Sequence, residues 1–212
     1  MEAARLSPAA ARTLVLASGS PARLRLLRDA GIEPRVVVSG ADETAEPGLG
    51  TAAVVAMLAE RKAATVAALY PGELVLGCDS LLDVDGQPMG KPASADSAIG
   101  LLRKLAGREA RLCTGHWLID GGSGRQASDV AATIVRFGTP TDAELAAYVA
   151  TGEPLQLAGA FSIDGRGAPF IDGIDGDPSN VIGLSLPLLR RLLAELDIAI
   201  TDLWRPTGQA SA

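Results

Sequence analysis

Asp79 and Ser80, adjacent in the sequence, form the first candidate site for chemistry. They follow an apolar run at residues 75–78 that predicts a buried strand, so we expect them at its exposed end. An Asp-Gly pair at 85–86 predicts a hairpin, because both residues tolerate the positive φ of its turn. Proline after Lys91 favours extended backbone, so Lys91 is expected to face back toward Asp79. This arrangement suits a polyanionic ligand; an incidental surface ion pair is the alternative.

A second candidate lies where a predicted strand at 13–17 runs into a short Ser/Gly loop. Ser20 is a favourable N-cap residue and proline follows it, so a helix is expected to begin there. Ser18 precedes this helix and Arg23 lies in its first turn. Free backbone N–H groups, the helix dipole and a guanidinium together favour phosphate binding. An ordinary strand-to-helix turn is the alternative, since the loop lacks the glycine pattern of a Walker loop.

Further charged residues follow the second predicted strand, at 36–39. Asp42 and Glu43 lie in the loop after it, where carboxylates are usually solvated charges, but the position leaves a metal role open. A helix is then predicted from a Thr51 cap to about residue 69, with Lys62 on its far half.

Histidine and cysteine are too sparse for a zinc site. Cys78 and Cys113 lie far apart in apolar runs, which favours buried free thiols. His116 is the single histidine and stands beside Trp117, an arrangement more typical of a packed strand residue than of a catalytic one. Any bound metal is therefore expected to have mainly oxygen ligands, which points to Mg²⁺ or Mn²⁺.

Composition narrows the class of protein. The 212 residues are 48% hydrophobic, which is enough for a substantial core. A net charge of −6 and 3% aromatic residues argue against a nucleic-acid polymer as partner. Neither a signal peptide nor a membrane-spanning run is evident, so we expect a cytoplasmic protein with no membrane partner. Residues 1–12 and 205–212 are expected to be flexible tails.

The remaining pattern predicts helices and strands that alternate early, with antiparallel strands in the middle. This order is typical of an α/β fold with a mixed, twisted sheet. The later predicted elements are a helix at 95–106 capped by Ser94, strands at 109–120 and 126–137, a helix from the Thr141 capping box to Gly152, a strand at 158–164 with a hairpin partner at 169–174, a polar loop at 175–180, and a helix at 187–196.

Taken together, these motifs resemble the Maf family of nucleoside triphosphate pyrophosphatases over roughly residues 13–200. Their joint order and spacing is far more specific than any one of them. The motifs are LVLASGSPARLRLLRDAGI, the 42–43 acidic pair, LAERKA, LGCDSLLDVDGQPMGKP, CTGH, GEPLQLAGAFSIDG and GDPSNVIGLSLPLL.

The resemblance implies a fold and an activity. It implies one elongated, two-lobed α/β domain of the inosine triphosphate pyrophosphatase type at 13–200, with a cleft between the lobes and a possible homodimer. It also implies hydrolysis of nucleoside triphosphates, modified ones included, to the monophosphate and pyrophosphate with a divalent metal. The alternative is a binding protein that acts in septum formation, although an interaction module has no need of the full set of charged residues.

The resemblance also assigns roles to individual residues. Asp79 matches the proposed catalytic acid, and Glu43 with Asp79 the metal-binding carboxylates. Lys62 and Lys91 match lysines that face the triphosphate. An ordinary aspartate is a weak base at neutral pH, so Asp79 is as suited to orienting water or metal as to accepting a proton. The residues matching substrate-binding positions are Ser18, Ser20, Arg23, Ser80 and Asp164.

This sequence departs from the family pattern where base choice is made. Ala22 replaces an arginine, Leu157 a lysine and Phe161 a tyrosine. Asp164 stands where glutamine is usual, and an ionised carboxylate cannot donate to a uracil carbonyl as an amide can. We therefore expect less preference for uracil and thymine, and better acceptance of bases with adjacent donors or of a cytosine amino group.

Overall fold

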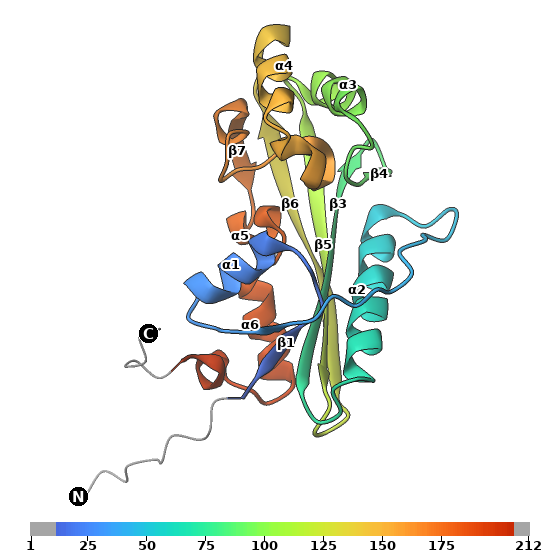
Figure 1. Ribbon diagram of the computed structural model, residues 1–212, viewed down its shortest axis with the longest axis vertical. Helices are drawn as coiled ribbons and strands as arrows, with labels where there is room; N and C mark the ends of the chain where they lie inside the picture. The colour runs from blue at the N-terminus through green and yellow to red at the C-terminus, as the bar shows by residue number, and fades with distance from the viewer. Residues whose placement is uncertain (1–11, 206–212) are drawn as a thin grey trace, which may run out of the picture.

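The computed structural model describes residues 12–205 as an elongated mixed α/β molecule (Figure 1), which confirms the predicted fold class. One seven-stranded sheet has the order β2-β1-β3-β5-β6-β7, with β4 paired to β3. Its strands are β1 (Leu14–Leu16), β2 (Arg35–Val36), β3 (Leu74–Val84), β4 (Gln87–Met89), β5 (Glu109–Asp120), β6 (Gln126–Phe137) and β7 (Ile171–Asp175).

Helices cover both faces of this sheet. The α-helices are α1 (Pro21–Asp29), α2 (Thr51–Ala67), α3 (Ala95–Leu105), α4 (Asp142–Ala150), α5 (Pro178–Ile182) and α6 (Leu186–Glu195), with 3₁₀ turns η1 (Glu153–Gln156), η2 (Ala158–Ala160), η3 (Ala168–Phe170) and η4 (Ile200–Leu203). Figure 1 shows α2 along one face of the long strands and α1 with α6 along the other, while α3 and α4 lie together at one end.

The central strands β5 and β6 follow the predicted pattern closely. β5 and β6 occupy the predicted ranges and pair antiparallel, from Glu109 opposite Arg136 to Ile119 opposite Gln126. β1 runs parallel to both β2 and β3. The hairpin at 85–86 also forms, with φ values of 56° and 79°, because Asp and Gly accept left-handed backbone.

The core divides along the length of the sheet. At the end that carries α1 and α6, leucines of β1, β3 and α6 pack together, including the predicted apolar stripe of the last helix. At the other end, α3, α4 and the far halves of β3, β5 and β6 enclose a second cluster with Phe137 and Phe161 in edge-to-face contact. A smaller group joins α2 to β1 and β3. Hence the middle of β3 lies where these clusters meet.

The predicted hairpin of strands at 158–164 and 169–174 is wrong. Residues 158–160 form η2, in which Gly159 and Ala160 have φ values of 74° and 62° that no strand accommodates. The later segment instead gives β7, which pairs with β6. Periodicity alone could not exclude this outcome, because small residues tolerate both conformations.

Four smaller expectations are also corrected. β3 continues through Asp79 to Val84, so the acid lies within a strand rather than at its end. α2 is preceded by Gly50 as N-cap, because Thr51 Oγ1 donates instead to Asp83, at 2.6 Å. β2 is shorter than predicted, and the loop at 175–180 contains the start of α5.

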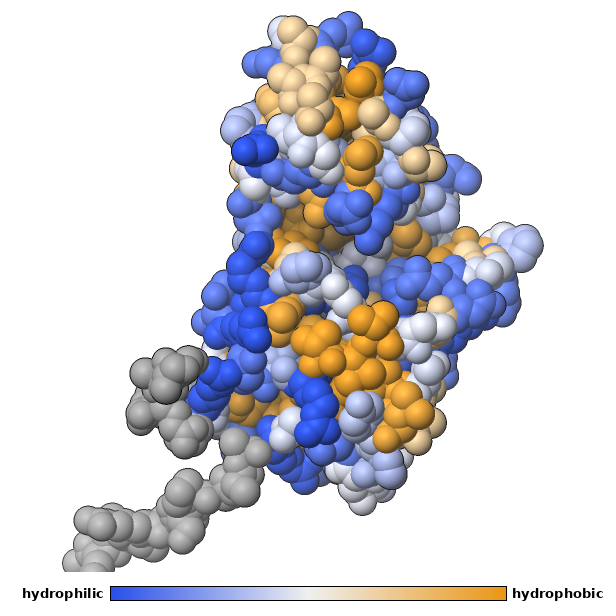
Figure 2. Space-filling model, viewed as in Figure 1, coloured by the Kyte–Doolittle hydropathy of each residue, from blue (hydrophilic) through white to orange (hydrophobic). Residues whose placement is uncertain are grey.

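One hydrophobic patch occupies part of the surface on the face seen in Figure 2. Val36 of the edge strand β2 and Val38 just after it are among the exposed large apolar side chains. No described helix is long and apolar enough to cross a membrane. The predicted tails at 1–12 and 205–212 lie almost wholly outside the described residues. The two lobes, their cleft and the homodimer stay predictions.

Candidate functional site

A carboxylate–ammonium–carboxylate cluster lies between β3 and α2. Lys62 Nζ is 2.6 Å from Asp79 Oδ1 and 2.8 Å from Glu43 Oε1. Lys62 and Asp79 are only 8% and 9% exposed, whereas Glu43 comes from the exposed loop before α2. A buried ammonium that two carboxylates share is held tightly in place, since each partner is charged and directly bonded.

Two glycines allow α2 to approach the sheet closely enough for this contact. A Cβ built on Gly77 of β3 would lie 2.1 Å from the carbonyl oxygen of Ala59, and one on Gly115 of β5 would lie 2.2 Å from that of Val55. Any side chain at either position would push α2 away from β3. The close packing therefore sets the distance between Lys62 and Asp79.

A second cluster surrounds the guanidinium of Arg23 on α1, whose N-terminus forms as predicted with Ser20 as cap. Arg23 Nε donates to the Gly183 carbonyl at 2.8 Å, and its two terminal nitrogens donate to Ser18 Oγ and Ser80 Oγ, each at 2.9 Å. These bonds tie α1 to the loop before it, to β3 and to the turn after α5. Arg23 thus joins the start of α1 to β3 and to the turn after α5, which are far from it in the sequence.

Arg23 is buried, with only 9% of its surface exposed. Even so, no carboxylate within residues 12–205 forms an ion pair with it. All three acceptors around it are neutral, so its positive charge is buried without a counter-charge, which is costly. A guanidinium carries five N–H donors and three are used here. The remaining donors and the uncompensated charge suit an anion.

Asp79 and Ser80 belong to different clusters because successive side chains of a strand point to opposite faces. Val75, on the same side of β3 as Asp79, packs with α2 residues, whereas Leu76, on the side of Ser80, packs with α1 and α6. The Asp-Ser pair therefore contributes a carboxylate to the α2 side and a hydroxyl to the Arg23 side. Neighbouring positions in one motif serve two sets of contacts.

The Arg23 cluster extends to residues that the motif analysis did not select. Ser80 Oγ lies 2.9 Å from Thr114 Oγ1, which donates to the Asn180 carbonyl at 3.3 Å. Asn180 is fully buried, and its amide nitrogen donates to Leu112 O and Thr133 Oγ1, at 3.2 and 3.0 Å. Its Oδ1 has no hydrogen-bond partner within residues 12–205. Thr114 and Asn180 lie within the CTGH and GDPSNVIG motifs, which was the only signal for them.

Lys91 and Asp164 lie apart from both clusters. Lys91 is exposed and forms no ion pair with Asp79 among the described residues, and its orientation toward Asp79 stays a prediction. Asp79 pairs with Lys62 instead, because the continuous strand β3 turns it toward α2. Asp164 forms an ion pair with Arg25 of α1, a residue that the sequence analysis did not single out.

His116 has a structural role. It is buried beside Ser185, whose backbone N–H donates to Nε2 at 2.9 Å, and Nδ1 lies 3.0 Å from the Thr114 carbonyl. Burial lowers the pKa of the imidazole to about 4, although the bond to Thr114 opposes this shift. Neutral His116 therefore holds the N-terminus of α6 against β5. Cys78 is equally inert, since burial raises the pKa of its thiol to about 12.

The carboxylates of this site fit a magnesium-type ion only if other ligands complete the set. Within the described chain, no group of three or more His, Cys, Asp or Glu side chains could hold a metal. Asp79 and Glu43 nevertheless converge on one cation, the Lys62 ammonium. Mg²⁺ is commonly held by one or two carboxylates together with substrate phosphates, so this pair fits such an ion when a triphosphate supplies further oxygens.

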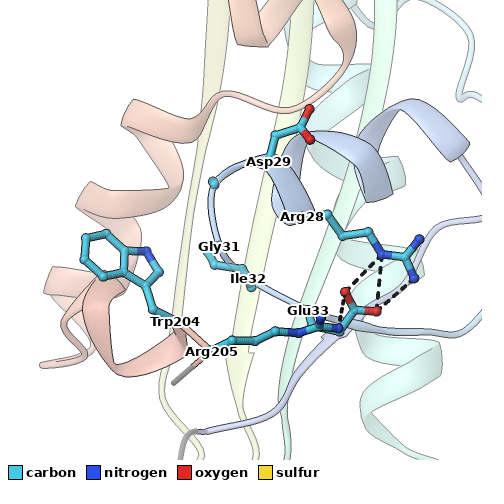
Figure 3. A pocket seen from close by; sticks show the side chains of 8 residues that line it. Arg28, Asp29, Gly31, Ile32, Glu33, Trp204 and Arg205 are labelled. Atoms are coloured by element: carbon cyan, nitrogen blue, oxygen red, sulfur yellow. Dashed lines mark hydrogen bonds and ion pairs between the residues drawn. The ribbon is translucent and has the colours of Figure 1, made fainter. Parts of the chain in front are cut away.

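A surface pocket lies elsewhere, at the opposite end of α1. Figure 3 shows Trp204 on one side of it and an ion network of Arg28, Glu33 and Arg205 on the other. None of the predicted site residues lines it. We therefore place the candidate site at β3 and not at this pocket.

Known proteins are similar to this chain over most of its length. The family model described as "Maf-like protein" matches residues 13–196. The chain is 59% identical to a protein of Streptomyces coelicolor named nucleoside triphosphate pyrophosphatase, over 95% of this chain and 98% of that protein. A protein of the same name from Mycobacterium sp. (strain JLS) is 53% identical, over 90% of this chain and 97% of that protein.

A solved structure shares the fold. The Staphylococcus aureus Ham1 protein superposes with a TM-score of 0.51 at 16% identity, covering 87% of this chain and 100% of that one. This level of identity informs only on architecture. The match over residues 13–196 and the identity to the two named relatives show that the chain belongs to the Maf family.

Proposed function

We propose that this protein hydrolyses nucleoside triphosphates to the monophosphate and pyrophosphate. The observation that carries the proposal is the Glu43–Lys62–Asp79 cluster, one residue along β3 from a hydroxyl bonded to the buried, uncompensated Arg23. Hydrolysis of a phosphoanhydride needs an oriented water and fixed positive charge around the transferred phosphoryl group. The names of the relatives from Streptomyces and Mycobacterium support the same activity.

Arg23 and the start of α1 bind the phosphates in this proposal. The guanidinium has donors free after it bonds Ser18, Ser80 and Gly183, and the first N–H groups of α1 add the positive end of a helix dipole. Ser18 and Ser80 position Arg23 and can also bond phosphate oxygens. Exposed Lys91, at the end of the β3–β4 hairpin, supplies a further ammonium that the substrate attracts.

Asp79 holds and orients the attacking water. Lys62 donates to one of its oxygens, which leaves the second oxygen to accept a bond from water. The ammonium also holds the carboxylate in a fixed orientation, so a proton leaving the water has a defined acceptor.

A divalent cation is part of the proposal. Glu43 and Asp79 would hold it together with phosphate oxygens, and when bound it supplies charge neutralisation and lowers the pKa of water.

The experiment is to identify products and the point of attack. Purified protein with MgCl₂ and a nucleoside triphosphate in ¹⁸O-labelled water should give monophosphate that carries the label and unlabelled pyrophosphate, as read by phosphorus NMR. Attack on the α-phosphorus is expected because α1 and Arg23 hold the distal phosphates. Formation of diphosphate and free phosphate would contradict the proposal.

A further inference from the structure

The loop between β2 and α2 carries Glu43 and has little apolar packing to hold it. Residues 42–48 are all exposed, so no side chain of this stretch is buried against the rest of the molecule. In the described part of the chain, no backbone–backbone hydrogen bond joins residues 42–48 to a strand or a helix. Exposed segments with few contacts open readily. The position of Glu43 therefore depends on a small number of polar side-chain contacts.

Arg61 of α2 contacts the backbone on both sides of Glu43. Its Nη1 donates to the Thr44 carbonyl at 2.8 Å and to the Asp42 carbonyl at 3.4 Å. Each terminal nitrogen of a guanidinium carries two N–H donors in a fixed plane, so one nitrogen can serve both carbonyls. Arg61 is thereby bonded to the residue before Glu43 and to the residue after it, and it restrains the backbone between them.

Asp42 and Lys62 complete this restraint. Asp42 Oδ1 accepts from the Thr44 N–H at 2.9 Å, which closes an Asx turn with Glu43 as its middle residue. Lys62 follows Arg61 on α2, and its Nζ lies 2.8 Å from Glu43 Oε1. The two cations of α2 thus have different tasks, because Lys62 pairs with the side chain of Glu43 and Arg61 holds its backbone.

The helix that carries both cations is itself firmly placed. α2 packs against Gly77 and Gly115, where a side chain would collide with its backbone. Its first residue, Thr51, is 2% exposed and donates to Asp83 at 2.6 Å. Side chains on a packed helix hold a more exact position than side chains on a loop. Arg61 therefore ties a loop with little packing of its own to the fixed position of α2.

We propose that Arg61 is a positioning residue for the divalent cation, because it holds the Glu43 carboxylate at the same site as Asp79; this inference rests on the proposed function. Groups that orient the ligands of a metal ion affect its binding strongly, and Mg²⁺ accepts only a narrow range of geometries. Arg61 bonds two backbone carbonyls, so its contacts leave the carboxylate oxygens of Glu43 free for a cation. Lys62, in contrast, pairs with those oxygens directly.

Manganese affinity tests the proposal. Arg61→Met removes both donors but keeps the apolar stem of the side chain. With a nucleotide analogue whose α,β-bridging oxygen is replaced by a methylene group, electron paramagnetic resonance measures free Mn²⁺ without hydrolysis. We expect the Kd of Mn²⁺ to rise by about tenfold or more in this variant. In the hydrolysis assay, the Mn²⁺ concentration for half-maximal rate should rise by a similar factor, whereas kcat at saturating Mn²⁺ should change far less.

A double-mutant cycle shows whether Arg61 acts through Glu43. Glu43→Gln should weaken Mn²⁺ binding by itself, and adding Arg61→Met to it should change the Kd by no more than about twofold. If the two effects multiply, Arg61 acts on the cation or the phosphates directly, and the proposal is overturned. An unchanged Kd in Arg61→Met alone overturns it as well.

The matched control is Glu46→Gln. This variant removes the ion pair between Arg61 and Glu46, whose charged atoms are 3.7 Å apart, but leaves both carbonyl acceptors in place. Its Kd for Mn²⁺ should therefore remain at the wild-type value. A rise equal to that in Arg61→Met would assign the effect to the ion pair and would contradict the proposal.

Backbone relaxation measured by NMR separates failure of this inference from failure of the proposed function, because it needs neither nucleotide nor cation. In Arg61→Met, the heteronuclear NOE of residues 42–46 should fall, which reports faster motion on the picosecond-to-nanosecond timescale. Glu46→Gln should retain wild-type values. A loop as ordered in Arg61→Met as in wild type overturns the inference, whatever the protein hydrolyses. Loosening in this variant, together with a wild-type protein that hydrolyses no nucleoside triphosphate, would contradict the proposed hydrolysis alone.

Discussion

The two sides of β3 differ in whether their charged residues are paired with opposite charges. On the α2 side, Asp79 and Lys62 are charged, paired and open to Glu43 in an exposed loop. On the α1 side, Ser80 and Arg23 belong to a buried network whose acceptors are all neutral. One side has a buried ammonium shared by two carboxylates, and the other has a buried guanidinium that pairs with no carboxylate among the described residues. In the proposed function, chemistry and phosphate binding therefore divide between the faces of a single strand.

The largest expected effect is on the α2 side. Asp79→Asn keeps the shape of the side chain but removes its charge, so kcat should fall by about 10²-fold or more while the fold persists. Circular dichroism checks the fold, and pyrophosphate release checks the rate. Asp96→Asn, an exposed aspartate in the first turn of α3, is the control. If the Asp79 variant retained more than roughly a tenth of wild-type activity, the key acid would be another residue.

Arg23→Met probes the other side and should act first on stability. It leaves the Gly183 carbonyl and two hydroxyls without their donor, which should lower the free energy of unfolding by about 2–4 kcal/mol. Urea denaturation measures this change. Arg28→Met removes an exposed arginine of the same helix and should alter stability by no more than about 0.5 kcal/mol. Equal stability of the two variants would show that the buried network does not contribute to the free energy of unfolding.

His116 gives an effect that is confined to acid pH. Its pKa in the folded protein is about 4, below the ordinary value of 6.5, so protons bind more tightly to the unfolded chain. This contribution is fully present above about pH 6.5 and is lost as pH falls toward 4, by roughly 3 kcal/mol. His116→Gln can still accept the Ser185 N–H but has no charge to gain. Its unfolding free energy should therefore fall less steeply than that of wild type over this range; parallel curves would contradict the assignment.

Much of the fold could be predicted because its signals are local. The hairpin at 85–86, the two long strands and the caps at Ser20, Ser94 and Thr141 depend on a few adjacent residues. Prediction failed at 158–164, where left-handed backbone at Ala160 is held by surrounding structure and not by its own preference. It also misjudged Asp79, because an apolar run shows where a strand begins but not how far polar residues extend it.

The candidate site was less predictable than the fold. Its residue types were selected from motifs, but their partners depend on tertiary contacts. Lys62 meets Asp79 only because glycines bring α2 close to β3, and Arg25 meets Asp164 across most of the chain. Neither pairing has a local signal. Contacts of this kind follow from the packing of whole elements.

The uncompensated charge of Arg23 has a consequence for turnover. In the proposed function, Arg23 binds the distal phosphates of the substrate and can bind the same phosphates equally well after they are cleaved off. Pyrophosphate left behind neutralises the guanidinium as well as the substrate did, so we expect departure of this product to be slow relative to bond cleavage. The turnover rate would then follow the rate at which pyrophosphate dissociates from the protein.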